Sequence, residues 1–173
     1  NGWLADGTGN PIYPADVMIE GDRIVAVERL PQAQAENVIE AEGKIVCPGF
    51  IDCHSHTDWS IHANPCMQST VRQGVTTEIV GNCGFSMAPV SDISRNYYEE
   101  VLKSFAYDGP PTWSSFAEYL DTVAQMGTAE NLAWFVGHSA IRTAAGVNVP
   151  SNDVTTDQMK VMENYVREAM DTG

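Results

Sequence analysis

The sequence predicts an α/β protein in which a short antiparallel β region precedes half of a (β/α)8 barrel. Three observations support this prediction. Residues 1–48 contain alternating apolar and polar runs around charged or glycine-bearing turns, a pattern typical of β-hairpins. From residue 49 onwards, short apolar runs alternate with helical patterns, which indicates parallel βαβ units. Residues 49–173 amount to 125 residues, about half of the roughly 250 in a typical barrel.

Two hairpins are predicted in the antiparallel region. The stretch "DVMIEGDRIVAVERL" turns at Gly21-Asp22, and "NVIEAEGKIVCPG" turns at Glu42-Gly43. A sheet this small is marginal by itself, so we expect it to pair with strands supplied from elsewhere.

The barrel region begins with a predicted buried parallel strand, "GFIDCH" at residues 49–54. A helix is expected over residues 65–73, because Asn64-Pro65 offers an N-cap and a first-turn proline, and Gly74 a stop. The elements that follow are predicted as strands at 75–82 and 131–138, and as helices at 95–107, 115–126 (with a capping box from Ser115 to Glu118) and 155–170.

The last of these helices carries an apolar stripe and is expected to end near Gly173. Its stripe consists of Met159, Met162, Val166 and Met170. Apolar faces that match the helical period are usually buried, so core packing is the expected role.

Composition excludes some classes of partner. The chain has 9 basic and 23 acidic residues, for a net charge of −14, and no cluster of Lys and Arg that would bind nucleic acid or an anionic membrane. No run approaches the roughly 20 apolar residues of a membrane span, and no secretory signal is visible at the start. The four cysteines lack CxxC spacing and are expected to be reduced, which favours a cytoplasmic location.

Potential metal ligands lie at the end of the first predicted barrel strand. His54 and His56 are spaced i, i+2, so on a strand they project to the same face. Imidazole is a common zinc ligand, and barrel active sites lie at the carboxyl ends of the strands. Asp52 and Asp58 flank the pair and are expected to orient it as outer partners. Two structural histidines that bond to backbone groups remain the alternative.

Cys83 follows the next predicted strand, in "GVTTEIVGNCGFSMAP". A thiolate is a strong zinc ligand and can bridge two ions. A buried free cysteine is the alternative, and it is the interpretation kept for Cys47, Cys53 and Cys66.

His138 ends "NLAWFVGH", at the carboxyl end of another predicted strand. There it would suit a catalytic role: orienting the substrate, stabilising a developing oxyanion or supporting a metal ligand. A hydrogen-bonded structural histidine is an equal alternative.

Longer stretches carry a resemblance. "VIEAEGKIVCPGFIDCHSHTD" resembles the amino-terminal part of the amidohydrolase superfamily, and "GVTTEIVGNCGFSMAP" with "NLAWFVGHSAIR" narrows the resemblance to the N-acyl-D-amino-acid deacylases, or D-aminoacylases. It extends over essentially the whole chain, and GNCG is its most specific part. It implies that residues 1–48 are the amino-terminal part of a small β-sandwich. Residues 49–173 would then be the first half of a metal-dependent-hydrolase (β/α)8 TIM barrel.

The resemblance also implies an activity and a cofactor. His54 and His56 match the family's HxH pair, and Cys83 matches the cysteine that ligates its tightly bound zinc, with one or two Zn2+ ions expected. The substrate would be a small N-acyl-D-amino acid, hydrolysed to a carboxylate and a free D-amino acid. The remaining ligands and the catalytic aspartate would lie in a carboxyl-terminal remainder of the same protein, so this chain alone is expected to be inactive.

Two other interpretations stay open. A cyclic amidohydrolase of the dihydroorotase or hydantoinase type would need a bridging carboxylated lysine, and only Lys103, within a predicted helix, comes near a strand end. A non-catalytic fragment or binding module is the other, because half a barrel exposes open strand edges. Thr57-Asp58 follows the histidine pair where the D-aminoacylases tend to carry two aspartates, which leaves the substrate subgroup open.

Overall fold

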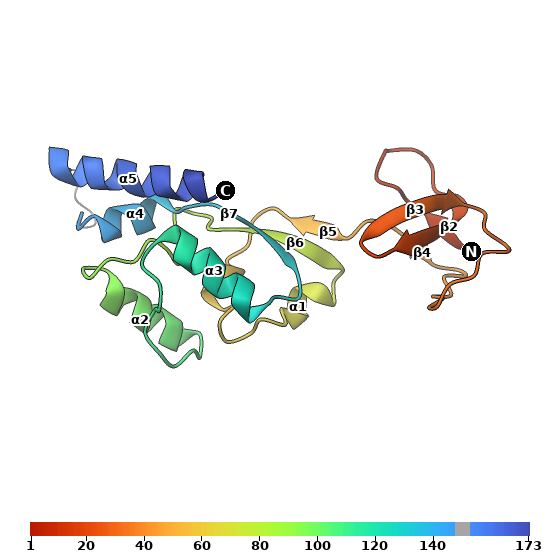
Figure 1. Cartoon of the computed structure of the whole chain (residues 1–173), viewed down its shortest axis with the longest axis horizontal. Coiled ribbons are helices and arrows are strands. Elements are labelled where there is room, and N and C mark those ends of the chain that lie inside the picture. Colours follow the sequence, from red (N-terminus) through yellow and green to blue (C-terminus); the bar gives the residue numbers. More distant parts are fainter. Residues whose placement is uncertain (148–152) are drawn as a thin grey trace. The chain divides into compact units, whose positions relative to one another are not determined.

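The computed structural model describes residues 1–147 and 153–173. The chain divides into two compact units, Asn1–Gly49 and Phe50–Gly173 (Figure 1). This division falls within one residue of the boundary expected from the sequence. Both units contain β-strands, and the helices belong to the second, so the fold is α/β.

The first unit is a four-stranded sheet with the order β3-β2-β1-β4. β2 and β3 form the hairpin predicted around Gly21-Asp22, with Glu20 opposite Arg23. Gly21 has a φ of +61°, a conformation that glycine adopts readily. The strands are β1 (Gly2–Leu4), β2 (Tyr13–Glu20), β3 (Arg23–Glu28) and β4 (Ile45–Val46).

The second predicted hairpin, around Glu42-Gly43, does not form, because β4 pairs with another strand. The turn is present, because the Lys44 N–H donates to the Ala41 carbonyl at 3.0 Å, but residues 38–40 form no strand. β4 pairs in parallel with β1 instead. The N–H of Trp3 donates to the carbonyl of Lys44, and the N–H of Ala5 to that of Val46. β1, which local patterns did not predict, pairs with β2 along one edge and with β4 along the other.

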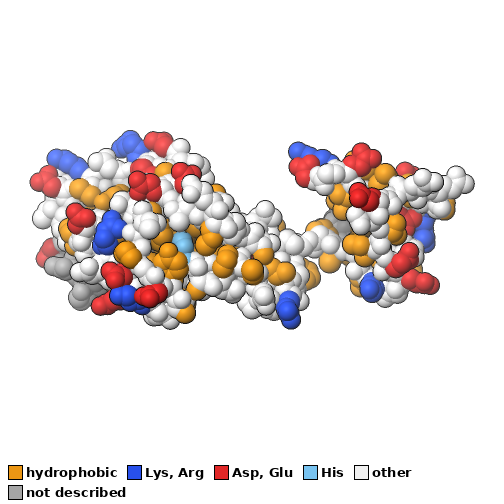
Figure 2. Space-filling view, turned by 60° about the horizontal axis from the view of Figure 1, so that its bottom comes forward, with side chains coloured by type: hydrophobic (Ala, Val, Ile, Leu, Met, Phe, Trp, Pro, Cys, Tyr) orange, Lys and Arg blue, Asp and Glu red, His pale blue; other side chains and the backbone are white. Residues whose placement is uncertain are grey.

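The first unit buries few apolar side chains. Leu4 and Ala15 are buried, whereas Ile19, Ile24 and Ile39 are 63%, 66% and 89% exposed. Figure 2 shows hydrophobic side chains on the surface of both units. Within the residues that the structure describes, this sheet does not close a core of its own.

The second unit contains a parallel sheet with the order β5-β6-β7. Its strands are β5 (Phe50–Asp52), β6 (Val75–Val80) and β7 (Asn131–Trp134). The parallel arrangement was predicted from the sequence. The predicted burial of the first strand is wrong, because β5 is an edge strand of this sheet and leaves Phe50 and Ile51 58% and 62% exposed.

Five α-helices accompany this sheet in the described ranges. They are α1 (Gln68–Val71), α2 (Arg95–Ser104), α3 (Phe116–Met126), α4 (His138–Ala144) and α5 (Thr156–Thr172), with a 3-10 turn η1 at Thr57–Trp59. The capping box predicted at Ser115 and Glu118 is present. α4 was not predicted. None of the helices formed by the described residues has the length and apolar character needed to cross a membrane.

α1 is much shorter than the helix predicted over residues 65–73. Met67 precedes it with a φ of 44°, a left-handed conformation, and provides no side-chain cap. The Asn64 side chain does not cap this helix; its backbone carbonyl accepts a hydrogen bond from the Met67 N–H at 3.2 Å. The left-handed residue interrupts the helical path, so only the turn after it is helical. Gly74 ends the segment as predicted, with a φ of +86°.

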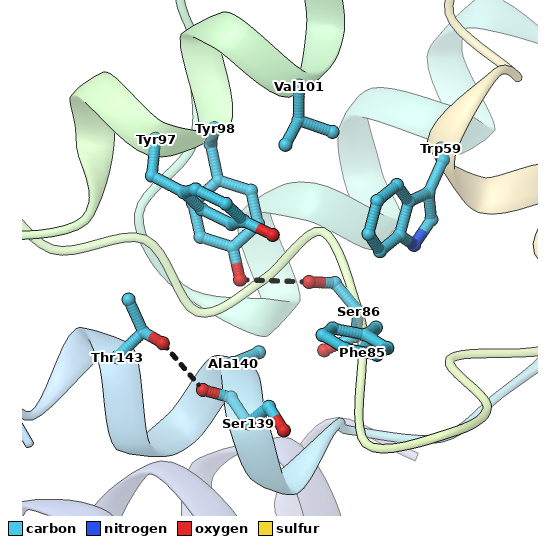
Figure 3. A pocket seen from close by; sticks show the side chains of 9 residues that line it. All are labelled: Trp59, Phe85, Ser86, Tyr97, Tyr98, Val101, Ser139, Ala140 and Thr143. Atoms are coloured by element: carbon cyan, nitrogen blue, oxygen red, sulfur yellow. Dashed lines mark hydrogen bonds between the residues drawn. The ribbon is translucent and has the colours of Figure 1, made fainter. Parts of the chain in front are cut away.

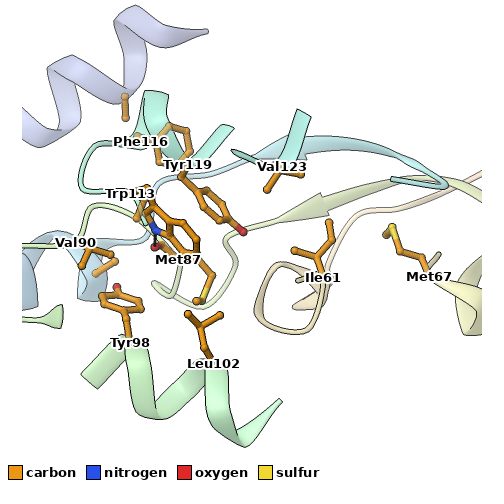
Figure 4. Packing of buried hydrophobic residues seen from close by; sticks show 13 residues of the cluster. Ile61, Met67, Met87, Val90, Tyr98, Leu102, Trp113, Phe116, Tyr119 and Val123 are labelled. Carbon is orange, nitrogen blue, oxygen red and sulfur yellow. Dashed lines mark hydrogen bonds between the residues drawn. The ribbon is translucent and has the colours of Figure 1, made fainter. Parts of the chain in front are cut away.

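The main core lies around α2, α3 and the loops that follow β5 and β6 (Figure 4). Trp113, Tyr119 and Leu102 are fully buried in it. The Trp113 indole N–H donates to the Met87 carbonyl at 2.7 Å, and the Tyr119 hydroxyl donates to the Asp58 carbonyl at 3.2 Å. These hydrogen bonds anchor both loops to α3 and the segment before it.

α5 packs against α3 and α4, but the expected burial of its apolar stripe is largely wrong. Met162 is buried against Ile141 and Val147, whereas Met159, Val166 and Met170 are 45%, 43% and 72% exposed. The contacts with α3 and α4 cover only part of the stripe. Met159 and Val166 line an open groove, of which the buried Met162 also forms part.

Candidate metal centre

The loops at the carboxyl ends of β5 and β6 bring His54, His56 and Cys83 together. The potential ligand atoms of the three residues all lie within 4.8 Å of one another. His54 Nε2 is 3.1 Å from Cys83 Sγ, and the centroids of the two imidazole rings are 5.7 Å apart. All three residues are exposed, so a metal ion and a substrate can reach them from solvent.

These three residues fit a zinc ion. Two imidazole nitrogens and one thiolate sulfur are donors that zinc accepts, at about 2.0–2.1 Å and 2.3 Å. Two donors on one tetrahedral ion are then roughly 3–4 Å apart, which agrees with the 3.1 Å between Nε2 and Sγ. Three protein ligands leave a position for water or substrate, which is the arrangement of catalytic rather than structural zinc sites.

A strained turn positions Cys83. Gly81, Cys83 and Gly84 all have positive φ, at 79°, 56° and 80°, and a cysteine in this region is uncommon. A Cβ on Gly81 would lie 2.0 Å from the carbonyl oxygen of Phe135, so only glycine fits there. The turn thus packs directly on the chain that leaves β7.

The histidine segment is held by hydrogen bonds to β6 and the turn after it. The Ser55 hydroxyl donates to Glu78 Oε2 at 2.6 Å, and the Ser55 N–H donates to the Ile79 carbonyl at 3.1 Å. The Asn82 side-chain amide donates to the Ser55 carbonyl at 3.2 Å. Ser55 lies between the two histidines, so these bonds hold the backbone that carries both imidazoles beside the turn of Cys83.

Glu78 and Asn82 were missed in the sequence analysis. Asn82 belongs to the quoted GNCG motif, and Glu78 is an acidic residue inside a predicted buried strand, so both carried a signal. The structure shows Glu78 fully buried, with Oε1 lacking a hydrogen-bond partner. Burying a carboxyl group with an unpartnered oxygen costs free energy, and the contact that Glu78 makes in return is the hydrogen bond to Ser55.

The two flanking aspartates occupy different environments. Asp52 accepts a hydrogen bond from the His54 backbone N–H at 3.0 Å, so it orients the chain rather than a ring. Asp58 is fully buried, and burial, with Glu78 nearby, raises its pKa to about 7. No hydrogen bond in the described part of the chain joins the Asp58 carboxyl group to an imidazole, and its role as an outer partner stays a prediction.

His138 lies apart from the three clustered side chains. It is the first residue of α4 and not the end of a strand, because β7 ends at Trp134. The chain turns at Gly137, whose N–H donates to the Ser86 hydroxyl at 2.9 Å, and the helix begins there. The His138 side chain lines the groove beside Met159. Its predicted catalytic role gains no support from this placement.

Two other titratable groups near the sheet, the partly buried His62 and the buried Glu130, have pKa values shifted by their surroundings. His62 stacks on Trp113 with centroids 4.7 Å apart, and burial lowers its pKa to about 4. Burial also raises the pKa of Glu130, and the neighbouring carboxyl group of Glu78 adds to this effect. The four cysteines are free and exposed, so the buried placement expected for Cys47, Cys53 and Cys66 is wrong. Among the described residues Cys83 alone joins the histidine pair.

Comparisons with known proteins match this chain along most of its length. A family model described as "Amidohydrolase family" matches residues 37–167. D-aminoacylase from Alcaligenes xylosoxydans xylosoxydans is 35% identical over 172 residues, which cover 99% of this chain and 35% of the relative. The chain therefore spans about a third of the length of the curated relatives it matches.

Solved structures give the same result. A structure of D-aminoacylase that concerns its binuclear metal centre superposes with a TM-score of 0.84 at 34% identity, covering 99% of this chain and 35% of that one. A structure of N-acyl-D-glutamate deacylase from Bordetella bronchiseptica has a TM-score of 0.82 at 31% identity, covering 98% and 35%. The latter is complexed with zinc and a phosphonate inhibitor that mimics the tetrahedral intermediate.

Proposed function

Because this chain belongs to the amidohydrolase family, we propose that it is the amino-terminal part of an enzyme that hydrolyses the amide bond of N-acyl-D-amino acids. The products would be a carboxylate and a free D-amino acid. The observation that carries the proposal is the convergence of His54, His56 and Cys83 within 4.8 Å. The substrate class is supported by relatives named D-aminoacylase and N-acyl-D-glutamate deacylase.

His54, His56 and Cys83 would hold one or two zinc ions. Bound zinc supplies Lewis-acid polarisation of a carbonyl group and makes water more acidic. To act as ligands, the imidazoles must be neutral and the thiol deprotonated. The hydrogen bond from Ser55 to Glu78 keeps the histidine segment in place, so that its donors stay directed at the position that faces Cys83.

The carboxyl-terminal remainder of the protein completes this site. We expect it to supply the further metal ligands and a carboxylate that moves a proton from water to the leaving amine. Among the described residues, the cluster of potential metal ligands consists of His54, His56 and Cys83 and includes no carboxylate. The 173-residue chain is accordingly expected to have little or no activity by itself.

The same proposal assigns the two units to a larger fold. The parallel sheet β5-β6-β7 would be the first part of a (β/α)8 barrel, which the exposed side chains of edge strand β5 support. The antiparallel sheet would be part of a β-sandwich, supported by its exposed apolar side chains Ile19, Ile24 and Ile39. Strands from the remainder would cover both surfaces.

A substrate panel tests the function. The zinc-loaded full-length protein is incubated with N-acetyl-D-leucine, N-acetyl-L-leucine, hydantoin and dihydroorotate, and release of free amino acid or ring-opened product is measured. We expect hydrolysis of the D-amide alone. Cys83→Ala should lose bound zinc and turnover, whereas Cys66→Ala, at an exposed free cysteine outside the cluster, should retain both. Ring opening without hydrolysis of the linear amide would contradict the proposal.

A further inference from the structure

Trp59 lies next to the candidate metal centre, and none of the steps above uses it. It ends the 3-10 turn η1, three residues after His56, and its backbone N–H donates to the His56 carbonyl at 3.1 Å. Its indole ring is partly buried and packs against the main core of the second unit. The side chain therefore connects the folded core with the loop that carries both histidines.

The indole ring contacts a candidate metal ligand. The ring centroids of Trp59 and His56 are 6.3 Å apart and the ring planes meet at 81°, an edge-to-face arrangement that aromatic pairs favour. The other ring beside His56 is that of His54, which is itself a candidate ligand. Covalent geometry restricts the outer torsion of an imidazole only weakly, so the direction of its nitrogens depends on such neighbours.

Trp59 also contacts the turn that carries Cys83. Phe85 lies two residues after Cys83, and its ring centroid is 5.5 Å from that of Trp59, with the ring planes at 84° (Figure 3). Beyond the end of α2, the ring centroid of Phe105 is 6.0 Å from that of Trp59. The indole thus joins the two loops whose side chains would bind the metal ion.

Packing rather than hydrogen bonding holds the indole ring. Its N–H is buried and has no hydrogen-bond partner in the described part of the chain. Trp59, Phe85 and Val101 help to line a space of only about 30 Å3 (Figure 3), room for roughly one or two water molecules. The ring therefore has little freedom to swing away from His56. A phenyl ring at position 59 would keep an aromatic edge there without losing a hydrogen bond.

We infer that Trp59 is a positioning residue of the metal centre: its ring orients the His56 imidazole and holds it beside the turn of Cys83. The inference rests on the proposed function, which places a zinc ion at these residues. A ligand whose ring is free to rotate must be ordered when the ion binds, whereas a ligand that is already oriented loses less conformational entropy. Removal of the Trp59 ring should therefore weaken zinc binding.

Three variants of the full-length protein test this role. Trp59→Leu removes the ring, and Trp59→Phe keeps an aromatic edge beside His56. Trp134→Leu is the matched control, because Trp134 is also partly buried against the main core but its ring contact is with Tyr119. Zinc affinity is measured by competition with a chromophoric chelator, and the visible bands of bound cobalt report the ligand geometry. Thermal melting of the metal-free proteins gives the stability of each variant.

We expect Trp59→Leu to lower zinc affinity about tenfold, at the lower end of the range for partners that orient metal ligands, and to shift the visible bands of bound cobalt. Trp59→Phe should restore most of the affinity. Trp134→Leu should lower the melting temperature and leave zinc affinity and the cobalt bands unchanged.

If Trp59→Leu does not fold, Phe85→Leu carries the test. It removes the ring that meets Trp59 from the Cys83 side, at a position that is 40% exposed. Its zinc affinity should fall at least about threefold, and an unchanged affinity would overturn the inference.

Zinc affinity and cobalt bands in Trp59→Leu equal to those of the parent would also overturn it. So would equal losses of affinity in Trp59→Leu and Trp134→Leu, or a Trp59→Phe variant that binds zinc as weakly as Trp59→Leu. A parent that binds zinc with the expected dependence on Trp59 but hydrolyses no N-acyl-D-amino acid would overturn the proposed function and leave the positioning role standing. A parent that binds no zinc would overturn both.

Discussion

The hydrogen bond from Ser55 to Glu78 gives the most specific structural prediction, because it links the histidine segment to the strand that leads to Cys83. Ser55→Ala removes the donor and leaves both oxygens of the buried Glu78 carboxyl group without a partner. An unsatisfied buried group costs about 1–3 kcal/mol, and hydrogen bonds that involve charge lie in the upper part of this range. We therefore expect Ser55→Ala to lower the free energy of unfolding by about 2 kcal/mol.

The same change should weaken metal binding. Loss of an outer partner that orients ligands typically lowers metal affinity about 10–100-fold. Zinc affinity of the full-length protein is measured by competition with a chromophoric chelator, and stability from urea unfolding at fixed zinc and pH. Ser104→Ala, which removes an exposed hydroxyl on α2, is the control and should change neither quantity.

A double-mutant cycle isolates the interaction. Glu78→Met removes the buried carboxyl group and keeps a side chain of similar length, so Ser55→Ala should cost much less in its presence. We expect a coupling energy of at least about 1 kcal/mol between the two positions. Additive effects, or a Ser55→Ala variant with the zinc affinity and stability of the parent, would refute the idea that this hydrogen bond positions the histidines.

Two further predictions concern the turn beside Cys83 and the partly buried His62. Gly81→Ala should unfold the protein or abolish zinc binding, because its Cβ would lie 2.0 Å from the Phe135 carbonyl oxygen. Gly127 also has a positive φ, but open space surrounds it, so Gly127→Ala should cost only the backbone strain of about 1–3 kcal/mol. Equal losses of stability by thermal melting in the two variants would contradict this prediction. Burial lowers the pKa of His62 from 6.5 to about 4, so the unfolded chain takes up a proton first, and the stability that this histidine contributes above pH 6.5 is lost as pH falls towards 4. His62→Phe keeps an aromatic ring on Trp113 but cannot take up a proton, so its free energy of unfolding, measured by urea titration, should fall less steeply between pH 6.5 and 4 than that of the parent. The same dependence of unfolding free energy on pH in both proteins would contradict this prediction.

Local patterns predicted much of the second unit and the core of the site. The i, i+2 histidines and the cysteine after the next strand converge as expected, because neighbouring parallel strands present their carboxyl ends on one edge. The capping box at Ser115 and the turn at Gly21 form as predicted, because each is specified by residues a few positions apart.

The remaining features depend on contacts that no local pattern specifies. β4 pairs with β1 across about 40 residues of sequence, and the left-handed Met67 shortens α1. His138 begins a helix because Gly137 packs against the turn after Cys83. The bond from Ser55 to Glu78 joins residues 23 positions apart, and periodicity alone did not indicate that most of the stripe on α5 is exposed.

Cobalt substitution tests the central claim most directly. Cobalt(II) occupies zinc sites and gives a near-ultraviolet charge-transfer band when a thiolate binds it. We predict this band for the cobalt-loaded full-length protein and for its Cys66→Ser variant, and we predict that Cys83→Ser abolishes it. A band that persists in Cys83→Ser, or that is missing from the cobalt-loaded parent, would contradict the assignment of His54, His56 and Cys83 to one metal centre.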